Sequence, residues 1–381
     1  MDLQEYRKKI DKVDEEILRL FKERMEISGQ IARVKQTQGL PLLDIARERE
    51  KLETIRGQTD AQTSSYANML YMLLFELSRA HQGGLLQTES ALGQNILETA
   101  EHTERVFPRR ALVACQGAEG AYSQVACDRI FAEPNILYCT SFEGVFSAVR
   151  DGLCQYGVLP LENSTAGSVN MVYDLMMRHD FKIVRSARIK IDHNLLAKPG
   201  VKKEDVREIF SHEQAIQQCA EYLKGFGKNV KITAVASTAE AAKIAAESGR
   251  NDVAALASRS CCELYGLRGL ESSVQDKGNN YTRFICVSKN LEIYPGAERT
   301  SVMLTTAYKP GSLYRVLALI YTLGVNLVKL ESRPLPDRDF QFMFYFDLEI
   351  SIYSENFGRL IRELESVCEE FYYLGSYAEI L

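Results

Sequence analysis

The sequence predicts a multidomain protein that joins an all-α region, an α/β region and a C-terminal α+β region. Long stretches with helical periodicity come first, an alternation of short strands and helices follows, and a β-α-β-β-α-β order of the ferredoxin-like type ends the chain. A chain of 381 residues has room for two or three domains. We therefore expect domains at residues 1–88, 111–290 and 299–376, with a linker at residues 89–110 that holds a short helix near residues 92–100.

The composition is that of an ordinary globular protein with no general affinity for nucleic acid. Hydrophobic residues make up 46% and charged residues 25% of the chain, and the formal net charge is −5 without a long basic run. No apolar run reaches the ~18 residues that a membrane span needs, and the N-terminus does not resemble a signal peptide. We expect a cytoplasmic protein with neither nucleic acid nor membrane as a partner.

The cysteines and histidines give no sign of a metal site. The nine cysteines form no C-x-x-C pair, and the five histidines show neither H-x-H nor H-x-x-x-H spacing. In a reducing compartment such cysteines are most often small buried hydrophobic residues. We expect no metal.

The first predicted helix runs from Leu3 to Gln38, which contains no proline and only one glycine. Apolar side chains recur in it at three- and four-residue steps, namely at Ile10, Val13, Ile17, Leu20 and Ile31. Such a helix is roughly 54 Å long, which exceeds the core of one small domain. A helix of this length usually finds a partner in another subunit.

Two cations lie along the apolar stripe of this helix. Arg24 is seven residues from both Ile17 and Ile31, and Lys35 returns to within about 20° of the same line. A buried cation must be paired or must await an anionic ligand. A structural ion pair, a snorkelling side chain and a ligand site all remain open on this observation.

Two further helices carry polar residues that complete a recognisable set. After Pro41, the spacing places Asp44, Arg47 and Glu48 on one face, and a third helix near residues 65–81 places Ser78 one turn before Gln82. Together with Arg7, Arg24 and Lys35, this pattern resembles the all-helical chorismate mutases over residues 1 to about 82.

The resemblance implies a role for each of these residues. In that family two chains interlace and each site takes one arginine from the partner chain, here Arg7. The rearrangement is intramolecular, so the enzyme only has to hold the compact conformer and stabilise charge on the ether oxygen. The implied roles are carboxylate binding by Arg7, Arg24, Arg47 and Ser78, ether-oxygen contact by Lys35 and Gln82, hydroxyl binding by Glu48, and hydroxyl-end contact or helix capping by Asp44.

From residue 111 the middle region alternates predicted strands with helices, which suggests an α/β domain with a mostly parallel sheet. The segment GVLPLENSTAGSV, residues 157–169, ends an apolar run in four polar side chains, which is either a solvated turn or a ligand site at the carboxyl end of a strand. Residues 117–120 read G-x-x-G and lack the dinucleotide fingerprint, so we expect no cofactor. These glycines allow a tight turn into a helix near Ser123, whose N-terminus can hold an anion. Ser211 and Gln214 have capping-box spacing.

Four segments in this order resemble the signature blocks of prephenate dehydratases across residues 111–288. They are CQGAEGAYS, GVLPLENSTAGSV, SHEQA and NYTRF, with Cys115 and Glu213 as departures from the usual pattern. The resemblance implies a two-lobed α/β domain whose cleft removes carbon dioxide and the ring hydroxyl from prephenate. The implied substrate-binding residues are Glu162, Asn163, Ser164, Thr165, Ser211, His212, Gln214, Thr282 and Arg283.

Within this set the resemblance assigns proton donation to Thr282. A threonine hydroxyl is a poor acid, so we expect donation through a polarised network that includes Asn163, Ser211 and Gln214. Arg283 either binds a carboxylate or braces its loop, and both roles stay open.

The C-terminal region has the expected elements at residues 301–307, 311–323, 325–333, 340–350, 355–370 and 372–379. The segments KPGSL and ESRP resemble ACT domains of phenylalanine-regulated enzymes, with Ser312-Leu313-Tyr314 as a departure in the effector loop. The implied contacts of L-phenylalanine are Gly311, Ser312, Leu313, Glu331 and Ser332.

The combined resemblance is to bifunctional chorismate mutase–prephenate dehydratases that phenylalanine inhibits. It implies conversion of chorismate to phenylpyruvate by a homodimer or higher homo-oligomer. The alternatives are an arogenate dehydratase and a non-catalytic amino-acid-binding regulator. The fused mutase argues against the first alternative, and the cationic set with Thr282 argues against the second.

Overall fold

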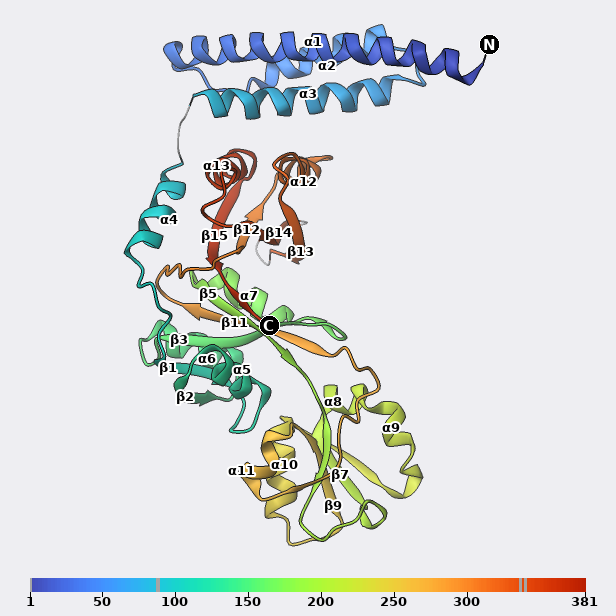
Figure 1. Cartoon of the computed structure of the whole chain (residues 1–381), viewed down its shortest axis with the longest axis vertical. Coiled ribbons are helices and arrows are strands. Elements are labelled where there is room, and N and C mark those ends of the chain that lie inside the picture. Colours follow the sequence, from blue (N-terminus) through green and yellow to red (C-terminus); the bar gives the residue numbers. More distant parts are fainter. Residues whose placement is uncertain (1, 87–89, 336–337, 339–340) are drawn as a thin grey trace. The chain divides into compact units, whose positions relative to one another are not determined.

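The computed structural model describes residues 2–86, 90–335, 338 and 341–381, which form two compact units (Figure 1). One unit comprises Met1–Asn95, Lys309–Gly324 and Glu355–Cys368, and the other comprises Ile96–Tyr308, Val325–Ser354 and Glu369–Leu381. The expected domain boundary at residues 88 and 89 and the expected strand start at residue 340 lie outside the described residues.

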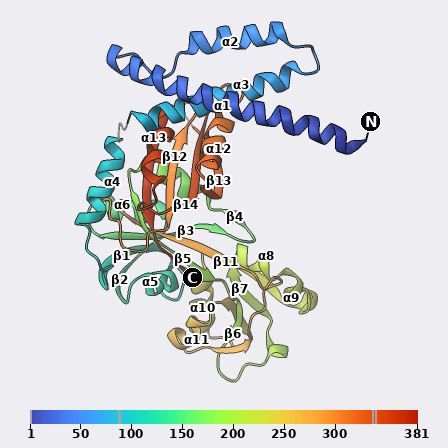
Figure 2. The ribbon, with the colours of Figure 1, turned by 45° about the horizontal axis from the view of Figure 1, so that its top comes forward.

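The first unit begins with three helices whose bounds follow the periodicity of the sequence. They are α1 (Leu3–Gln38), α2 (Ile45–Gln58) and α3 (Ser64–Leu85), and α4 (Ala91–His102) follows, longer than expected by a residue or two at each end. The amino-terminal end of α1 extends beyond α2 and α3 in both views (Figures 1 and 2). The unit also contains α12 (Ser312–Thr322) and α13 (Phe357–Val367).

The face of α1 that packs in the single chain is not its apolar stripe. Its buried residues are Ser28, Gly29 and Ala32, and a Cβ added at Gly29 would lie 2.8 Å from Leu85 Cδ1 on α3. Small residues therefore let α1 approach α3 closely. The stripe itself is solvent-exposed, with Ile17 at 58% relative exposure. The stripe thus does not bury Arg24 among apolar side chains, because the described residues supply no surface that covers the stripe.

The larger sheet of the second unit has the order β16-β5-β11-β3-β1-β2, with β4 paired to β3. Its strands are β1 (Arg110–Gln116), β2 (Glu133–Cys139), β3 (Tyr156–Asn163), β4 (Gly167–Ser168), β5 (Lys182–Lys190), β11 (Tyr281–Ser288) and β16 (Glu379–Ile380). The helices α5 (Tyr122–Ile130), α6 (Phe142–Arg150) and α7 (Asn170–Arg178) belong to this part of the chain.

A second sheet has the order β10-β6-β9-β7-β8. Its strands are β6 (Asn194–Ala197), β7 (Glu208–His212), β8 (Lys231–Val235), β9 (Val253–Ala257) and β10 (Arg268–Glu271), with the helices α8 (Glu213–Gln218), α9 (Ala220–Lys224), α10 (Thr238–Glu247) and α11 (Ser260–Tyr265). The expectation of a mostly parallel sheet is wrong for both sheets. Strands β5 and β11 lead the chain into the second sheet and back, so they pair antiparallel to each other, and β6 pairs antiparallel to β9.

The C-terminal sheet has the order β13-β14-β12-β15, and every pairing in it is antiparallel. Its strands are β12 (Arg299–Thr305), β13 (Asn326–Pro334), β14 (Phe342–Glu349) and β15 (Glu370–Tyr377). Along the chain, α12 follows β12 and α13 follows β14. The element order expected from the sequence is confirmed, with ends that shift by one to three residues at most positions.

Candidate functional site

The second unit contains a cavity of about 390 Å³ between its two α/β sheets. The cavity lies at the carboxyl ends of β1, β3, β7 and β8, where open α/β sheets bind ligands. The lining residues with polar side chains are Gln116, Tyr122, Ser123, Asn163, His193, His212, Gln214, Gln218, Ser237, Thr238 and Thr282. The polar end of GVLPLENSTAGSV therefore supplies a cavity wall through Asn163.

Asn163 and Thr282 face each other across neighbouring strands in this wall. They are register partners of β3 and β11, and Asn163 Nδ2 donates a hydrogen bond to Thr282 Oγ1 over 2.9 Å. The amide orientation is fixed because Asn163 Oδ1 accepts from the backbone and hydroxyl of Thr165, at 3.0 and 2.7 Å, and from Ala166 N at 2.9 Å. Since Thr282 Oγ1 accepts from Asn163, its own hydroxyl hydrogen is available to an acceptor in the cavity.

A buried polar network extends from this pair. Asn163 Nδ2 also lies 2.7 Å from Asn280 Oδ1, and Asn280 Nδ2 donates to Gln218 Oε1 over 2.9 Å. The same Gln218 oxygen lies 2.9 Å from His193 Nε2, so this ring nitrogen carries the hydrogen. Burial lowers the pKa of His193, which favours the neutral imidazole.

Sequence reasoning missed His193, Gln218 and Asn280 as site residues. Asn280 lies two residues before Thr282 in the segment that drew attention, so its position was a usable signal. His193 immediately precedes β6, and Gln218 ends α8, so only the fold brings them together. No local pattern marks either of them.

The electrostatics of the cavity come from neutral donors and helix ends. No Lys, Arg, Asp or Glu side chain of the described ranges lines it. The N-terminal residues of α5, Tyr122 and Ser123, and of α10, Thr238 with its N-cap Ser237, border it. Backbone N–H groups and the positive ends of helix dipoles therefore favour an anionic ligand there.

Several predicted residues of the dehydratase set lie outside the cavity lining. Ser211 is buried and donates to Leu256 O over 2.8 Å, while Ser164 donates to Asn279 O over 2.6 Å and accepts from Tyr281 N over 2.9 Å. The predicted capping box is wrong, because His212 is the N-cap of α8 and its Nδ1 accepts from Gln214 N at 3.3 Å. Ser211 belongs to β7 instead.

Thr165 borders an adjacent pocket of about 250 Å³. Gln214 and Gln218 line both this pocket and the larger cavity. Glu162 and Arg283 are absent from the lining of either, although they neighbour Asn163 and Thr282 in sequence.

On the helices of the first unit, three predicted mutase residues meet between α1 and α3. Arg24 Nη1 donates to Leu74 O over 2.9 Å and to Ser78 Oγ, and burial lowers the pKa of Arg24. Gln82 Nε2 donates to Ser28 Oγ over 2.9 Å. Arg24, Ser78 and Gln82 therefore share one polar contact region.

The other mutase residues are occupied locally or exposed. Lys35 Nζ donates to Leu42 O over 2.6 Å, and Asp44 caps α2 by accepting from Arg47 N at 3.0 Å. The Arg47 side chain pairs with Glu50 at 2.6 Å. Glu48 pairs with Arg79, a residue that sequence reasoning missed, and Arg7 is exposed on α1. A single chain thus gathers only part of the predicted set.

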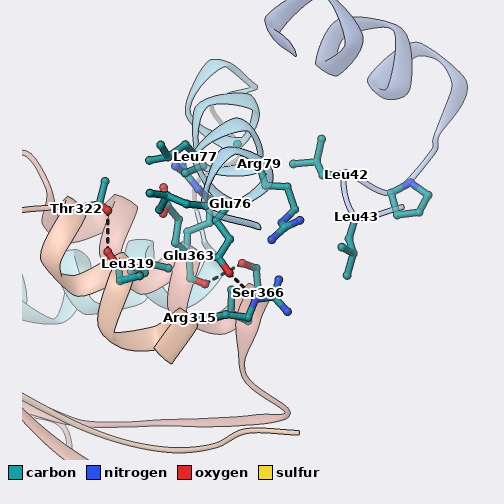
Figure 3. A pocket seen from close by; sticks show the side chains of 17 residues that line it. Leu42, Leu43, Glu76, Leu77, Arg79, Arg315, Leu319, Thr322, Glu363 and Ser366 are labelled. Carbon is teal, nitrogen blue, oxygen red and sulfur yellow. Dashed lines mark hydrogen bonds and ion pairs between the residues drawn. The ribbon is translucent and has the colours of Figure 1, made fainter. Parts of the chain in front are cut away.

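The first unit also holds a pocket of about 420 Å³ that the sequence did not predict (Figure 3). Residues of α3, α12, α13 and the segment 41–43 line it, and most of its surface is apolar. In its wall Glu76 of α3 pairs with Arg315 Nε of α12 at 2.9 Å. Burial raises the pKa of Glu76 in spite of this cation.

The predicted effector residues fall into both units. Gly311 is the N-cap of α12 with a φ of 84°, a left-handed conformation that favours glycine, and Ser312 and Leu313 begin that helix. Glu331 and Ser332 lie on β13, where successive side chains point to opposite faces. Glu331 accepts a hydrogen bond from Ser168 of β4.

Comparison with known proteins identifies both catalytic regions. The family model of chorismate mutase type II matches residues 6–83, and that of prephenate dehydratase matches residues 113–292. A bifunctional chorismate mutase/prephenate dehydratase of Aquifex aeolicus is 31% identical, with 100% of this chain and 99% of the relative aligned. Within the described ranges, no helix has the length and apolarity to cross a membrane.

Two shorter matches cover the region after the helices. Arogenate dehydratase/prephenate dehydratase 2 of Arabidopsis thaliana is 37% identical, with 70% of this chain and 73% of the relative aligned. The prephenate dehydratase of Arthrobacter aurescens, solved in complex with L-Phe, is 27% identical with a TM-score of 0.64 and covers 70% of this chain and 90% of that one. The match to the Aquifex relative over both whole chains shows that this protein belongs to the family of bifunctional chorismate mutase/prephenate dehydratases.

Proposed function

We propose that this chain rearranges chorismate to prephenate on its helices and converts prephenate to phenylpyruvate in the cavity of its second unit. The observation that carries the second step is the Asn163–Thr282 hydrogen bond of 2.9 Å in a cavity that faces the ends of two helices. The full-length similarity to bifunctional relatives supports the pairing of both steps in one chain.

In the dehydratase step, Thr282 donates its hydroxyl proton to the departing ring hydroxyl, which leaves as water, and a proton from solvent restores the threonine hydroxyl. Asn163 holds Thr282 Oγ1 by hydrogen bonding, so the threonine proton points into the cavity. Loss of the ring carboxylate as carbon dioxide supplies the electron pair that expels the hydroxyl, and aromatisation drives both departures. The helix ends at Ser123 and Thr238, with Gln214 and His212, bind the carboxylates of prephenate.

In the mutase step, the helices bind a dianion without forming a covalent bond. Arg24, Arg47 and Ser78 bind the carboxylates, Lys35 and Gln82 stabilise the ether oxygen, and Glu48 accepts from the hydroxyl, with Asp44 as the cap of α2. Arg7 of a second copy completes the site. The exposed apolar stripe of α1 supports this dimer, because Ile10, Val13 and Ile17 lie uncovered in the single chain.

The C-terminal region is an ACT regulatory domain that binds L-phenylalanine through Gly311, Ser312, Leu313, Glu331 and Ser332. The strand order β13-β14-β12-β15 and the phenylalanine-bound Arthrobacter relative support this assignment. We place the mutase at residues 1–88, the dehydratase at 111–290 and the regulatory domain at 299–376. A homodimer or higher homo-oligomer in the cytoplasm is part of the same proposal.

Arogenate is the second candidate substrate, since the Arabidopsis relative is named for both substrates. Arogenate carries an ammonium group where prephenate carries a ketone. A buried ammonium needs a carboxylate partner, and no Asp or Glu of the described residues lines the cavity. The cavity therefore favours prephenate, while the fused mutase supplies it.

The test is a time course of the purified protein with chorismate, in which chorismate, prephenate and phenylpyruvate are separated and quantified. Prephenate should rise and then fall as phenylpyruvate appears. A parallel assay with arogenate should give little phenylalanine. Consumption of chorismate without phenylpyruvate, or faster turnover of arogenate than of prephenate, would contradict the proposal. Light scattering of the same sample should give at least twice the chain mass of 43.0 kDa.

A further inference from the structure

A buried group of charged side chains lies on the face of β3 and β11 that points away from the cavity. Strand side chains alternate, so Thr282 and Asn163 point into the cavity while their neighbours Arg283 and Glu162 point to the other face. Arg283 has a relative exposure of only 3%, and its Nε lies 2.7 Å from Glu162 Oε1. These two residues are register partners, directly beside the Asn163–Thr282 pair.

The pairing of these strands is irregular at this point. Arg283 is opposite Glu162, whereas Phe284 is opposite Pro160, so Leu161 is an extra residue in β3. Pro160 has no N–H to donate to the hydrogen-bond ladder. Proline within a strand is therefore commonly found at a bulge. The bulge shifts the register by one residue and thereby brings Asn163 opposite Thr282. The Arg283–Glu162 pair is the register pair between the bulge and the Asn163–Thr282 pair.

Charged side chains of the C-terminal sheet form ion pairs with both Arg283 and Glu162. Arg283 Nη2 is paired with Asp347 of β14, a fully buried carboxylate that also accepts a hydrogen bond from Ser301. Lys329 Nζ of β13 lies 2.5 Å from Glu162 Oε2. Burial lowers the pKa of Arg283, but Asp347, Tyr377, Tyr345 and Glu162 together raise it above its ordinary value, so the guanidinium keeps its charge.

The backbones of the two sheets approach each other closely at Gly375. Gly375 of β15 has a φ of 143°, and a Cβ there would lie 2.3 Å from Ile183 O of β5. The chain then continues into β16, which pairs with β5. The C-terminal sheet is therefore tied to the sheet that carries Thr282 by backbone packing as well as by ion pairs.

We propose that Arg283 and Glu162 are positioning residues through which Asp347 and Lys329 of the C-terminal sheet set the geometry of Asn163 and Thr282. This inference rests on the proposed dehydratase function of the cavity. It assigns no substrate contact to Arg283 or Glu162. A small displacement of β13 or β14 would move one end of each ion pair and so alter the Thr282 hydroxyl, which a misplacement of about 1 Å is enough to impair.

The same contacts give the regulatory region a route to the cavity. Glu331, a predicted effector residue, lies 3.7 Å from Lys329 Nζ, and Ser168 donates to Glu331 and accepts from Lys329 at 2.8 Å. Lys329 is thus shared between Glu331 and Glu162. An effector that engages the Glu331 carboxylate changes the partner of Lys329, and with it the hold on Glu162.

The test compares three variants of the full chain. Asp347→Asn removes the carboxylate charge that pairs with Arg283, with little change of shape. Lys329→Met keeps the aliphatic part of the side chain and removes the ammonium group that pairs with Glu162. Arg188→Met is the matched control, because Arg188 is the β5 register partner of Arg283 but pairs with Glu379 instead, at 2.7 Å. Each variant is assayed for kcat and KM with prephenate, for chorismate consumption, and for inhibition and calorimetric binding of L-phenylalanine.

We expect Asp347→Asn to lower the dehydratase kcat by about 10- to 100-fold while KM and chorismate consumption change less than about threefold. Lys329→Met should weaken phenylalanine inhibition more than it weakens phenylalanine binding. Arg188→Met should match the wild type. A merely structural role would lower both activities, or raise KM, together with the yield of folded protein.

Wild-type kcat and wild-type inhibition in both test variants, or an equal loss in Arg188→Met, would overturn the inference. If Asp347→Asn does not fold, Lys329→Met decides by the same inhibition-to-binding comparison. A wild-type protein that forms no phenylpyruvate from added prephenate would instead refute the proposed function itself. The two failures are therefore distinguishable.

Discussion

The two catalytic regions differ in how much of a site one chain provides. At the cavity of the second unit, Asn163, Thr282, Asn280 and Gln218 are joined by hydrogen bonds of 2.7–2.9 Å. On the helices, Glu48 and Arg47 are paired with Arg79 and Glu50, and the apolar stripe of α1 is exposed. The residues of the cavity all come from one chain. The predicted mutase residues on the helices, by contrast, lack a surface that covers the apolar stripe of α1.

This difference follows from the elements that carry each site. Strand ends from two sheets converge on the cavity, and their polar groups hydrogen-bond to one another. A long helix spreads its residues along one line, so its charged groups take the nearest local partners until another molecule covers the stripe. The mutase site is accordingly expected to depend on association, and the dehydratase site is not.

The largest effect should come from removing the Thr282 hydroxyl. Thr282→Val keeps the side-chain shape, so prephenate should accumulate from chorismate while the dehydratase rate falls on the order of 10²–10⁴-fold. Thr282→Ser, which keeps a hydroxyl, should restore part of the rate. Phenylpyruvate formation by Thr282→Val at a near-normal rate would exclude this hydroxyl as the donor.

The corresponding change on the helices is Lys35→Ala. Loss of the ammonium that stabilises the ether oxygen should lower the mutase kcat by about 10²–10³-fold, with dehydration of added prephenate intact. Lys22→Ala on the same helix is the control, because Lys22 is exposed and outside the predicted set. Parallel loss of both activities in a folded Lys35→Ala protein would contradict two separate sites.

The sequence predicted the elements better than their surroundings. Helix bounds depend on local signals, so α1 was predicted from Leu3 to Gln38 as observed. The contacts of Arg24 with Leu74 and Ser78 were not predictable, because they depend on which face of α1 meets α3. Strand periodicity does place Thr282 and Arg283 on opposite faces, although the sequence alone left two roles open for Arg283.

The distribution of the cavity residues explains the remaining gaps. Asn163 and Thr282 were predicted because they sit in recognisable segments at strand ends. His193 lies in the segment between β5 and β6, and Gln218 ends α8. Only the pairing of β6 with β9 and the position of α8 bring them to Asn280. Contacts between distant segments carry no local signal in a single sequence.

A smaller effect is expected from the effector region. Gly311 has a φ of 84°, so Gly311→Val forces a β-branched residue into a strained conformation at the start of α12. Phenylalanine binding should weaken and inhibition of the dehydratase should be relieved, within a typical coupling of about 5- to 150-fold. Calorimetry and rates with and without phenylalanine measure both. Full inhibition of Gly311→Val at wild-type concentrations would place the effector elsewhere.

The smallest predicted effect is a pH dependence of stability that arises from His193 in the cavity. Burial lowers the pKa of His193 below its ordinary value of 6.5, while hydrogen bonding to Gln218 and the nearby Asp192 carboxylate oppose the shift. Below about pH 6.5, His193 therefore binds a proton more readily in the unfolded chain than in the folded protein. The stabilising contribution of neutral His193 is complete above this pH and is lost as the pH falls, by at most about 1.4 kcal/mol per pH unit.

Hydrogen exchange of the β6 amides, corrected for the intrinsic exchange rate, measures this loss because β6 starts directly after His193. From pH 7.5 to pH 5, their opening free energy should fall more in the wild type than in His193→Asn, which has no group that titrates in this range. Amides of α3 on the mutase helices should show the same pH dependence in both proteins. Equal pH dependence of the β6 amides in the two proteins would mean that His193 takes up a proton as easily in the folded lobe as in the unfolded chain.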